Sequence, residues 1–328
     1  MTAATTIKGS KPSPTTQRAV AFVAARRAGA EELGLELADL VGDPDQFVVE
    51  LRRGFAGLAD PEYVAGQQFI APGIGEVLGI RWPLMAGIAR TFRRATRKDS
   101  PAPLLFIAER LFRETALEYR WFALGILEAL VPKEPERVWQ LLRRAARDAG
   151  DWITVDTLAH PYGRGILLEP YRWAELEQLV YSPSRWERRL VGSTVATIPF
   201  IDRSAGRQPD VARRGLALVG ELIGDAEPDV QKALAWALRS LVLVDRSGVE
   251  AFCRREAATA VSDDDGHRAW VVRDALAKLD PVAADELRES LTGIRRRPGA
   301  AATSRAAGTA ARFESMDLGR PMPEPPLT

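Results

Sequence analysis

A tryptophan and an aspartate lie four residues apart near the middle of the chain, in the segment Asp151–Ala159. In a helix of 3.6 residues per turn, Trp152 and Asp156 are about 40° apart, so both lie on one face. A carboxylate can stabilise developing positive charge or act as a general base, and an indole ring attracts cations by roughly 0.5 to 2 kcal/mol. Since Asp is only a middling helix former, Asp156 needs an explanation beyond helix propensity.

A second candidate group lies on a later helix. Lys232, Trp236 and Arg239 are spaced i, i+4 and i+7, so they form one stripe. A second stripe with the same spacing consists of leucines and is expected to face the core: Leu234, Leu238 and Leu241. The first stripe is therefore available to solvent or to a ligand. The alternative is that Trp236 packs, partly buried, against the next helix, between solvated charges.

Three arginines lie in the first turns of another predicted helix, which starts near Ser182-Pro183. Arg185, Arg188 and Arg189 are unfavourably placed for the helix dipole, because its N-terminal end is positive. Guanidinium groups and helix N-terminal N–H groups together suit a phosphate, which guanidinium binds in a bidentate manner. The alternative is that Glu187 and neighbouring acids pair with these arginines at the surface.

Cysteine and histidine are too scarce for several other site types. The chain has one cysteine, Cys253, and two histidines, His160 and His267, so we expect no disulfide, no metal and no cofactor. His160 follows Asp156 by one turn and could hydrogen-bond it, or it could be an exposed residue at a helix end. A Ser-His-Asp or Cys-His arrangement cannot be assembled from these positions.

The elements that must position these residues are nearly all helical, and strand-like alternation is scarce. Four segments each open with a basic residue and continue as small, apolar helices: Arg120–Leu127, Arg188–Val195, Lys232–Arg239 and Arg268–Ala275. Helices recurring every roughly 35 to 50 residues are typical of HEAT-like solenoids, whose stacked pairs leave a concave groove. We therefore predict an all-α, HEAT-like helical-repeat solenoid with a concave groove, and a generic all-α bundle is the alternative.

One glycine-rich stretch, Gly73–Gly79, resembles a phosphate-binding loop only superficially. It follows no predicted strand, its glycine spacing is wrong, and it lacks the terminal Lys-Ser or Lys-Thr. We interpret it as a flexible junction between helices.

Composition bounds the domain organisation and the compartment. The 328 residues are 46% hydrophobic and 27% charged, with a net charge of +1, as in ordinary globular proteins. We predict a disordered leader over 1–16, a single HEAT-like-repeat domain over 17–294 and a flexible basic tail over 295–328, which has six arginines and three acidic residues. No apolar run spans a membrane and no signal sequence is evident, so we expect a cytoplasmic monomer without an obligate protein partner or membrane contact.

Three motifs in order along the chain carry a family resemblance. They are Trp152–Asp156, similar to Trp-x-x-x-Asp; Trp186–Arg189, similar to Trp-x-x-Arg; and Val230–Arg239, similar to Gln-Lys-Ala-x-x-Trp-x-Leu-Arg. Weaker support comes from Gly79–Leu84 and Glu118–Arg120. Over roughly residues 79–279 the chain resembles the AlkD-type DNA alkylation repair family, HEAT-like-repeat alkylpurine DNA glycosylases.

The resemblance implies roles for individual residues. It makes Asp156 the catalytic carboxylate, Trp152 and Trp236 the aromatic walls of the lesion cleft, and Arg189 a contact to the DNA backbone. Arg188 competes with Arg189 for that place. Further candidates for backbone contacts are Arg185, Arg188, Lys232 and Arg239. The chain departs from the family pattern in its long tails and in a longer connection over Asp202–Pro209, which affects the geometry of the groove.

The implied function is a monofunctional DNA glycosylase that excises cationic alkylated purines, of the 3-methyladenine and 7-methylguanine type, from duplex DNA for base excision repair. Such a base already carries positive charge, so its departure needs no general acid, and an ionised Asp156 would stabilise the sugar and position water. Two other functions stay open. One is a non-catalytic binder of damaged or branched DNA, and the other is a HEAT-like scaffold for protein interactions.

Overall fold

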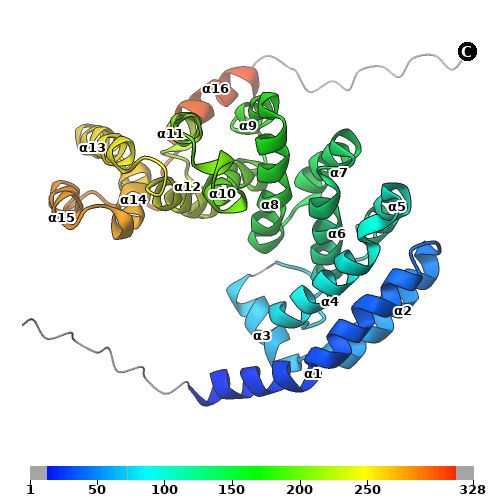
Figure 1. Ribbon diagram of the computed structural model, residues 1–328. Helices are drawn as coiled ribbons and strands as arrows, with labels where there is room; N and C mark the ends of the chain where they lie inside the picture. The colour runs from blue at the N-terminus through cyan, green and yellow to red at the C-terminus, as the bar shows by residue number, and fades with distance from the viewer. Residues whose placement is uncertain (1–12, 72, 315–328) are drawn as a thin grey trace, which may run out of the picture. The chain divides into compact units, whose positions relative to one another are not determined.

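The computed structural model describes residues 13–71 and 73–314. Over these residues the chain forms sixteen α-helices and four short 3-10 helices, and it has no strand (Figure 1). The 3-10 helices are η1 (Thr96–Lys98), η2 (Pro170–Arg172), η3 (Ala205–Arg207) and η4 (Leu276–Lys278). The all-α prediction is therefore confirmed.

The chain divides into two compact units, Met1–Ile126 and Leu127–Thr328, and the division falls within helix α6. The single domain expected over residues 17–294 stays a prediction, and each unit is described separately. The helices of the first unit are α1 (Pro14–Asp39), α2 (Pro44–Leu58), α3 (Pro61–Ile70), α4 (Trp82–Ala95), α5 (Pro101–Leu111) and the larger part of α6 (Leu117–Leu130).

The second unit contains the residues singled out in the sequence. After the end of α6, its helices are α7 (Pro135–Asp148), α8 (Trp152–Leu168), α9 (Trp173–Leu179), α10 (Arg185–Ile201), α11 (Pro209–Leu222), α12 (Pro228–Leu241), α13 (Arg246–Ser262), α14 (Gly266–Ala275), α15 (Pro281–Ser290) and α16 (Arg305–Glu314).

Helices of the second unit are arranged in two rows. In the first row α8 packs against α10, α10 against α12, and α12 against α14. In the second row α11 contacts α13 and α13 contacts α15, and α9, α11 and α13 also pack on α10, α12 and α14 (Figure 1). Each helix contacts its neighbours in the row, which favours a repeat arrangement over a bundle around one common core. The concave groove stays a prediction.

Local sequence signals explain where many helices begin. Proline occupies the first turn of nine α-helices in the described residues, where its fixed φ and missing N–H cause no loss. Several of the helices have an aspartate cap, and Asp151 is the cap of α8: its carboxylate accepts hydrogen bonds from the N–H and the hydroxyl of Thr154, at 2.8 and 2.7 Å. The cap fixes the start of the helix that carries Trp152 and Asp156.

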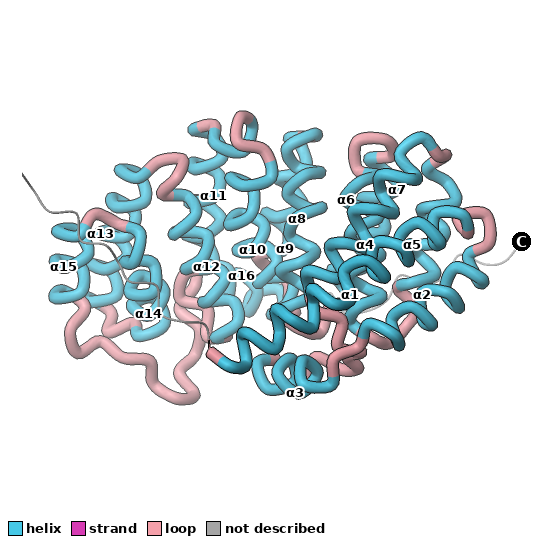
Figure 2. The backbone as a smooth tube through the Cα atoms, turned by 60° about the horizontal axis from the view of Figure 1, so that its bottom comes forward, coloured by secondary structure: helices cyan, strands magenta, loops and turns pink. Residues whose placement is uncertain are grey.

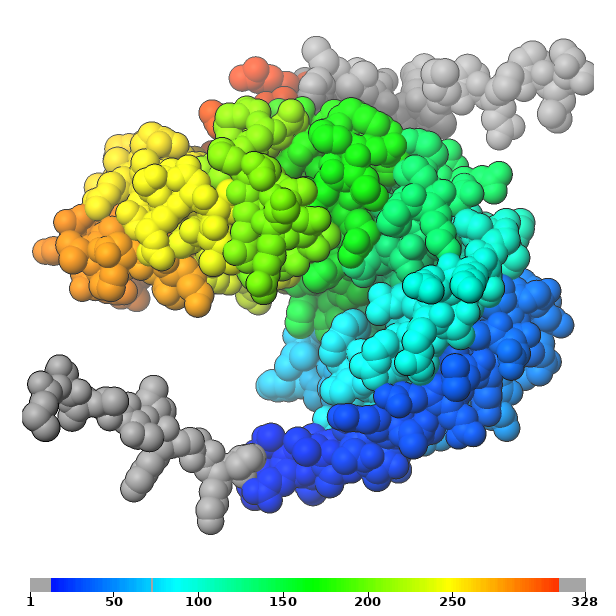
Figure 3. Space-filling model, in the orientation of Figure 1, coloured from blue at the N-terminus to red at the C-terminus, as the bar shows by residue number. Residues whose placement is uncertain are grey.

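Small side chains bring α10 and α12 into close contact. A Cβ atom added at Gly192 would lie 2.9 Å from both the carbonyl carbon and the Cβ of Ala233. The apolar stripe of α12 is buried as expected, because Leu234, Leu238 and Leu241 are fully inaccessible to solvent. In the space-filling view, the side chains of the second unit fill the spaces between successive helices on the visible face (Figure 3). This close packing sets which side chains of α10 reach α12.

Both expected tails differ in part from the structure. Helix α1 starts at Pro14, so the disordered leader was wrong for residues 14–16. The flexible tail was wrong for residues 305–314, which form α16 and pack on α11, with Ala306 buried. Alanine-rich sequence favours a helix there, and the hydroxyl of Ser304 accepts a hydrogen bond from the N–H of Ala307. Residues 1–12 and 315–328 of the two segments lie outside the described residues.

The segment between α15 and α16 is a long loop. Figure 2 shows it at the lower edge of the view, beside the ends of α14 and α12.

In the described part of the chain, no helix has the length and apolar character needed to cross a membrane.

Candidate functional site

The carboxylate of Asp156 is the centre of a hydrogen-bond network between α8 and α10. Arg189 approaches it with two nitrogens: Nε donates to Oδ1 at 3.1 Å and Nη2 donates to Oδ2 at 2.8 Å. The hydroxyl of Ser193, one turn farther along α10, donates to Oδ1 at 2.6 Å. Because Arg189 and Ser193 are spaced i, i+4, they lie on the face of α10 that packs on α8. Three donors therefore fix the orientation of the carboxylate.

The network extends to α12 through the same arginine. The third nitrogen of Arg189, Nη1, donates to the backbone carbonyl of Asp229 at 2.6 Å, and it lies 3.9 Å from the carboxylate oxygen Oδ1 of that residue. Arg189 is only 5% exposed. A charge this buried is stable only when it is paired, and here every guanidinium nitrogen has a protein partner. Arg189 thus connects three successive helices of one row.

Solvent still reaches the carboxylate. The side chain of Asp156 is 20% exposed, although the arginine beside it is almost completely buried. Trp152 is half-buried, and the guanidinium carbon of Arg189 lies 5.7 Å from the centre of its ring. The predicted pair of indole and carboxylate is therefore present on one face of α8, partly open to solvent, with Arg189 in contact with both.

The arginines at the start of α10 pair with an acidic segment between α11 and α12. Arg188 pairs with the buried carboxylate of Asp225 at 2.7 Å, and Arg185 lies 3.5 Å from a carboxylate oxygen of Glu227. Arg189 reaches the backbone carbonyl of Asp229, in the first turn of α12. The expected acidic partner, Glu187, instead accepts a hydrogen bond from the hydroxyl of Ser182. The arginine cluster therefore holds α10 to the start of α12.

This pairing occupies two of the arginines that were predicted to contact DNA. Arg188 also donates to the carbonyls of Ser182 and Pro183, at 2.8 and 3.0 Å, so its guanidinium is fully engaged. Arg189 must break one of its bonds before it can hold a phosphate. The backbone role of either residue stays a prediction, and it requires a rearrangement of what the structure shows. Arg185 is exposed and also stacks on Trp186, with 4.7 Å between guanidinium carbon and ring centre.

The stripe on α12 is accessible, as predicted. Lys232 is exposed and, within the described residues, has no hydrogen-bond or ion-pair partner. Trp236 is half-buried. Arg239 pairs with the carboxylate of Asp274 on α14 and donates to its carbonyl at 2.9 Å. Of the two basic residues in this stripe, Lys232 is therefore the one whose charge is available to bind an anion.

The structure does not place His160 in the network. It is exposed in the middle of α8, which continues to Leu168, and none of the described hydrogen bonds joins it to Asp156. Among residues 13–71 and 73–314, no group of three or more His, Cys, Asp or Glu side chains is placed to hold a metal ion. The expectation that the chain uses neither metal nor cofactor stays a prediction.

The two weaker motifs, which lie in the first unit, have a structural role. The carboxylate of Glu118 is inaccessible to solvent and accepts hydrogen bonds from the backbone N–H groups of Leu78, Gly79 and Ile80, at 3.0, 2.7 and 3.1 Å. Arg81 pairs with Asp60 at 2.6 Å. These bonds anchor the described end of the connection between α3 and α4, the glycine-rich stretch that we expected to be a flexible junction.

Sequence reasoning missed two members of the site, Ser193 and the carbonyl of Asp229. The spacing of Ser193 from Arg189 was a usable signal, because residues four apart share a helix face. A serine in a helix is nevertheless common enough that only the register between α8 and α10 identifies its partner. The carbonyl of Asp229 has no signal in the sequence, since any residue at that position offers the same group.

Comparisons with known proteins identify a family and a similar fold. The sequence model of a family described as "DNA alkylation repair enzyme" matches residues 51–279, which is more than half of the chain. A similar solved structure is a "predicted DNA alkylation repair enzyme" from Enterococcus faecalis, with a TM-score of 0.50, 17% identity, and coverage of 72% of this chain and 97% of that one. The curated proteins include no match. At this identity the solved structure supports the fold alone.

Proposed function

The chain belongs to the DNA alkylation repair enzyme family, and from that premise we propose that it is a monofunctional DNA glycosylase acting on cationic alkylated purines in duplex DNA. The family match supports a role in the repair of alkylated DNA. The choice of glycosylase over other repair chemistries depends on the Asp156 network, because a preoriented, partly exposed carboxylate suits a reaction that develops positive charge on a sugar.

The proposed reaction breaks the bond between C1′ of the deoxyribose and the purine nitrogen. Its electron pair moves to the base, which leaves as a neutral alkylpurine, so no general acid is required. Positive charge then develops on the sugar, and Asp156 stabilises it and orients a water molecule. The water oxygen attacks C1′ and its proton passes to the carboxylate or to solvent. The products are an abasic site and the free base.

In this proposal Arg189 and Ser193 are positioning residues in the free protein. Their three hydrogen bonds hold the carboxylate without rotational freedom, so it needs no reorientation as charge develops. The positive charge of Arg189 also offsets part of the field of the carboxylate. Trp152 and Trp236 form the walls that accept the cationic base, and Lys232 and Arg185 are the accessible backbone contacts.

A single observation carries the proposal: in a family of alkylation repair enzymes, the carboxylate of Asp156, which shares a helix face with Trp152, is held by three donors and stays partly exposed. An ion pair that only joins two helices needs no opening to solvent at its carboxylate, whereas a carboxylate that acts on a deoxyribose must be within reach of it.

Base release from methylated duplex DNA tests the activity. Duplex DNA treated with a methylating agent is incubated with the protein, and free 7-methylguanine and 3-methyladenine are measured over time. We expect release well above the rate of spontaneous depurination, with no added metal or cofactor. Release at the spontaneous rate, by protein that is folded and binds the duplex, would remove the glycosylase from consideration.

The second candidate function is a non-catalytic DNA binder, and the ion pair itself favours it. A carboxylate neutralised by a buried arginine can simply join α8 to α10. In that case the protein binds duplex DNA with salt-dependent affinity and releases no base. For the protein-interaction scaffold, duplex binding is absent as well, so the two measurements together separate the three functions.

A further inference from the structure

A cavity lined by three arginines lies in the second unit, at the C-terminal end of α15. Its volume is about 380 Å³, and Arg273 of α14, Arg288 of α15 and Arg295 of the following loop contribute to its lining. Nη2 of Arg273 donates to the carbonyls of Leu291 and Ile294, so this guanidinium also holds the loop in place. The residues after 279 lie beyond the region that matches the family.

Among the residues that the structure describes, acidic side chains do not balance the positive charge in this cavity. Arg288 pairs with Asp285, but Arg295 has no ion-pair or hydrogen-bond partner for its side chain in the described residues. Nε and Nη1 of Arg273 also lack partners within residues 13–71 and 73–314. Burial lowers the pKa of Arg273, and the nearby charge of Arg295 lowers it further. Two adjacent guanidinium groups without an acid to share are suited to a bound anion.

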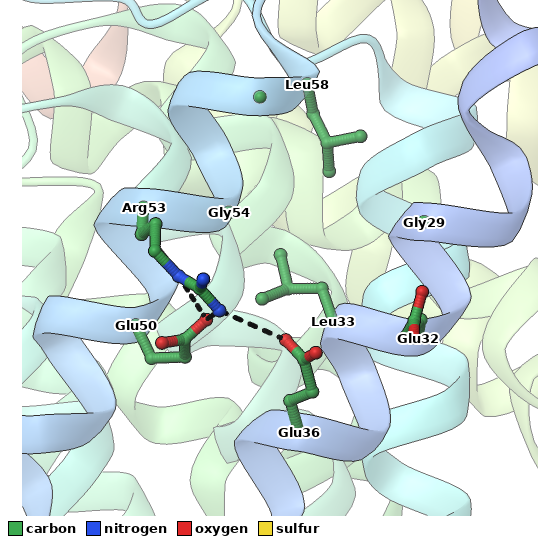
Figure 4. Close-up of a pocket in the computed structure, with 9 residues that line it drawn as sticks. Gly29, Glu32, Leu33, Glu36, Glu50, Arg53, Gly54 and Leu58 are labelled. Carbon is green, nitrogen blue, oxygen red and sulfur yellow. Dashed lines mark hydrogen bonds and ion pairs between the residues drawn. The ribbon is translucent and has the colours of Figure 1, made fainter.

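A cavity in the first unit provides a contrast. It has a volume of about 310 Å³ and lies between α1 and α2 (Figure 4). Its one arginine, Arg53, already pairs with Glu50 and Glu36, and Glu32 adds a further negative charge to the lining. Acidic side chains there outnumber basic ones, so the cavity does not attract a phosphate. An excess of arginine distinguishes the cavity of the second unit.

The loop that contributes Arg295 is anchored to the helix row of the candidate site. Its next residue, Arg296, donates to the side-chain oxygen of Gln231 on α12 at 2.9 Å and lies over the ring of Trp270 on α14, 4.9 Å from its centre. A Cβ added at Gly266 would lie 2.2 Å from the carbonyl oxygen of Arg295, so only glycine permits this approach. Gln231 is the chain neighbour of Lys232, the accessible cation of α12.

We propose that this arginine pocket, formed by Arg273, Arg288 and Arg295, binds a phosphodiester group of the DNA backbone. The inference rests on the proposed function in that its ligand is the duplex on which the site acts. Guanidinium groups bind phosphate in a bidentate manner, and the anchored loop presents them without ordering cost. Through Arg296 and Gln231, the loop that contributes Arg295 is joined to α12, the helix that carries Lys232.

The test is the salt dependence of binding to an undamaged duplex, measured with the full chain. Arg295→Gln removes one exposed charge that holds no other residue in place. Its matched control is Arg203→Gln, because Arg203 is also exposed and, in the described part of the chain, unpaired. One lost phosphate contact reduces the slope of log affinity against log salt by about 0.9, and hence the affinity by roughly tenfold at 0.1 M salt. We expect this for Arg295→Gln and for Arg273→Gln, and no change in the control.

Two results would overturn the inference. One is a slope and affinity equal to those of the unaltered chain in both pocket variants. The other is a rise in melting temperature with inorganic phosphate that Arg295→Gln abolishes while duplex binding is unaffected, which identifies a free phosphate as the ligand. Base release is measured on the same preparations. If the slope falls but the unaltered chain releases no base, the pocket is retained and the glycosylase proposal fails.

Discussion

At the scale of single residues, the main finding is the partner of Asp156. Sequence alone identified the carboxylate and its indole neighbour, and it identified Arg189, but it assigned the arginine to the DNA backbone. The structure instead joins Arg189 to Asp156 through two nitrogens and to Asp229 through the third. Residues 33 positions apart meet only when the register between two helices is known, so no local pattern could have predicted the pair.

Replacing Arg189 distinguishes its role in holding Asp156 from its predicted role in contacting the DNA backbone. Arg189→Gln removes two charge-assisted bonds to Asp156, and bonds of this kind contribute about 1.5 to 3 kcal/mol, so base release is expected to slow by roughly ten- to a hundredfold. The salt slope of duplex binding should not change, because the guanidinium is covered by protein. The measurements are single-turnover release and binding at several salt concentrations.

The control for that experiment is the adjacent arginine. Arg188→Gln breaks the ion pair with Asp225 but touches nothing in the Asp156 network. It should lower stability while leaving release by the folded protein close to that of the unaltered chain. A salt slope reduced by about one in Arg189→Gln would instead mean that the arginine leaves Asp156 to hold a phosphate, as the family resemblance implies.

At the scale of helices, the sequence was most informative where local signals determine the outcome. Proline at helix starts and aspartate caps account for many of the observed boundaries, and the leucine stripe of α12 correctly predicted its buried face. The signals failed for α16, where an alanine-rich helix was taken for part of a tail because its apolar partner on α11 is distant in the sequence. They also failed for the arginines of α10, whose acidic partners precede α12.

The close contact between α10 and α12 can be tested at Gly192. A methyl group there would meet Ala233 at 2.9 Å, so Gly192→Ala forces the two helices apart. We expect a loss of about 1 to 3 kcal/mol in the free energy of unfolding, the usual cost of overpacking, as measured by urea denaturation. Gly125→Ala is the matched control, because a methyl group on that helical glycine meets nothing within 4 Å.

The control should move in the opposite direction, since alanine in a helix is favoured over glycine by roughly 0.5 to 1 kcal/mol. Equal effects of the two substitutions would contradict the packing described for α10 and α12. Because Arg189 lies one turn before Gly192, Gly192→Ala should also slow base release in the protein that remains folded.

At the scale of the whole molecule, the sequence correctly predicted an all-helical chain, and its three ordered motifs correctly indicated the family. The arginine pocket could not be predicted, because its three members come from α14, α15 and a loop whose course depends on contacts with Gln231 and Trp270. A basic run such as Arg295–Arg297 indicates charge, but only the fold shows which of its members are paired.

The single cysteine reports on unfolding of the second unit. Cys253 is fully buried, and burial raises the pKa of its thiol from 9.0 to about 12, so the reactive thiolate is scarce in the folded state at pH 8. A thiol reagent should label the folded protein slowly and the urea-unfolded protein at once. Rapid labelling of the folded chain would contradict the packing around α13, and Cys253→Ala provides the blank.

The same thiol makes the free energy of unfolding fall as the pH rises. Its pKa is higher in the folded state than in the unfolded state, so the contribution is fully present below about pH 9 and is lost as the pH rises toward 12. We expect the free energy of unfolding to fall over this interval by more in the unaltered chain than in Cys253→Ala.

The account depends most on the claim that the carboxylate of Asp156 carries the reaction. The direct test is single-turnover release of 7-methylguanine from methylated duplex DNA by the unaltered chain and by Asp156→Asn, at a temperature where both are folded. Asparagine keeps the shape and removes the charge, so we expect release to slow at least about a hundredfold, the usual cost of losing a preorganised electrostatic group, while the salt slope of duplex binding stays unchanged. Release by Asp156→Asn at the rate of the unaltered chain would contradict the account.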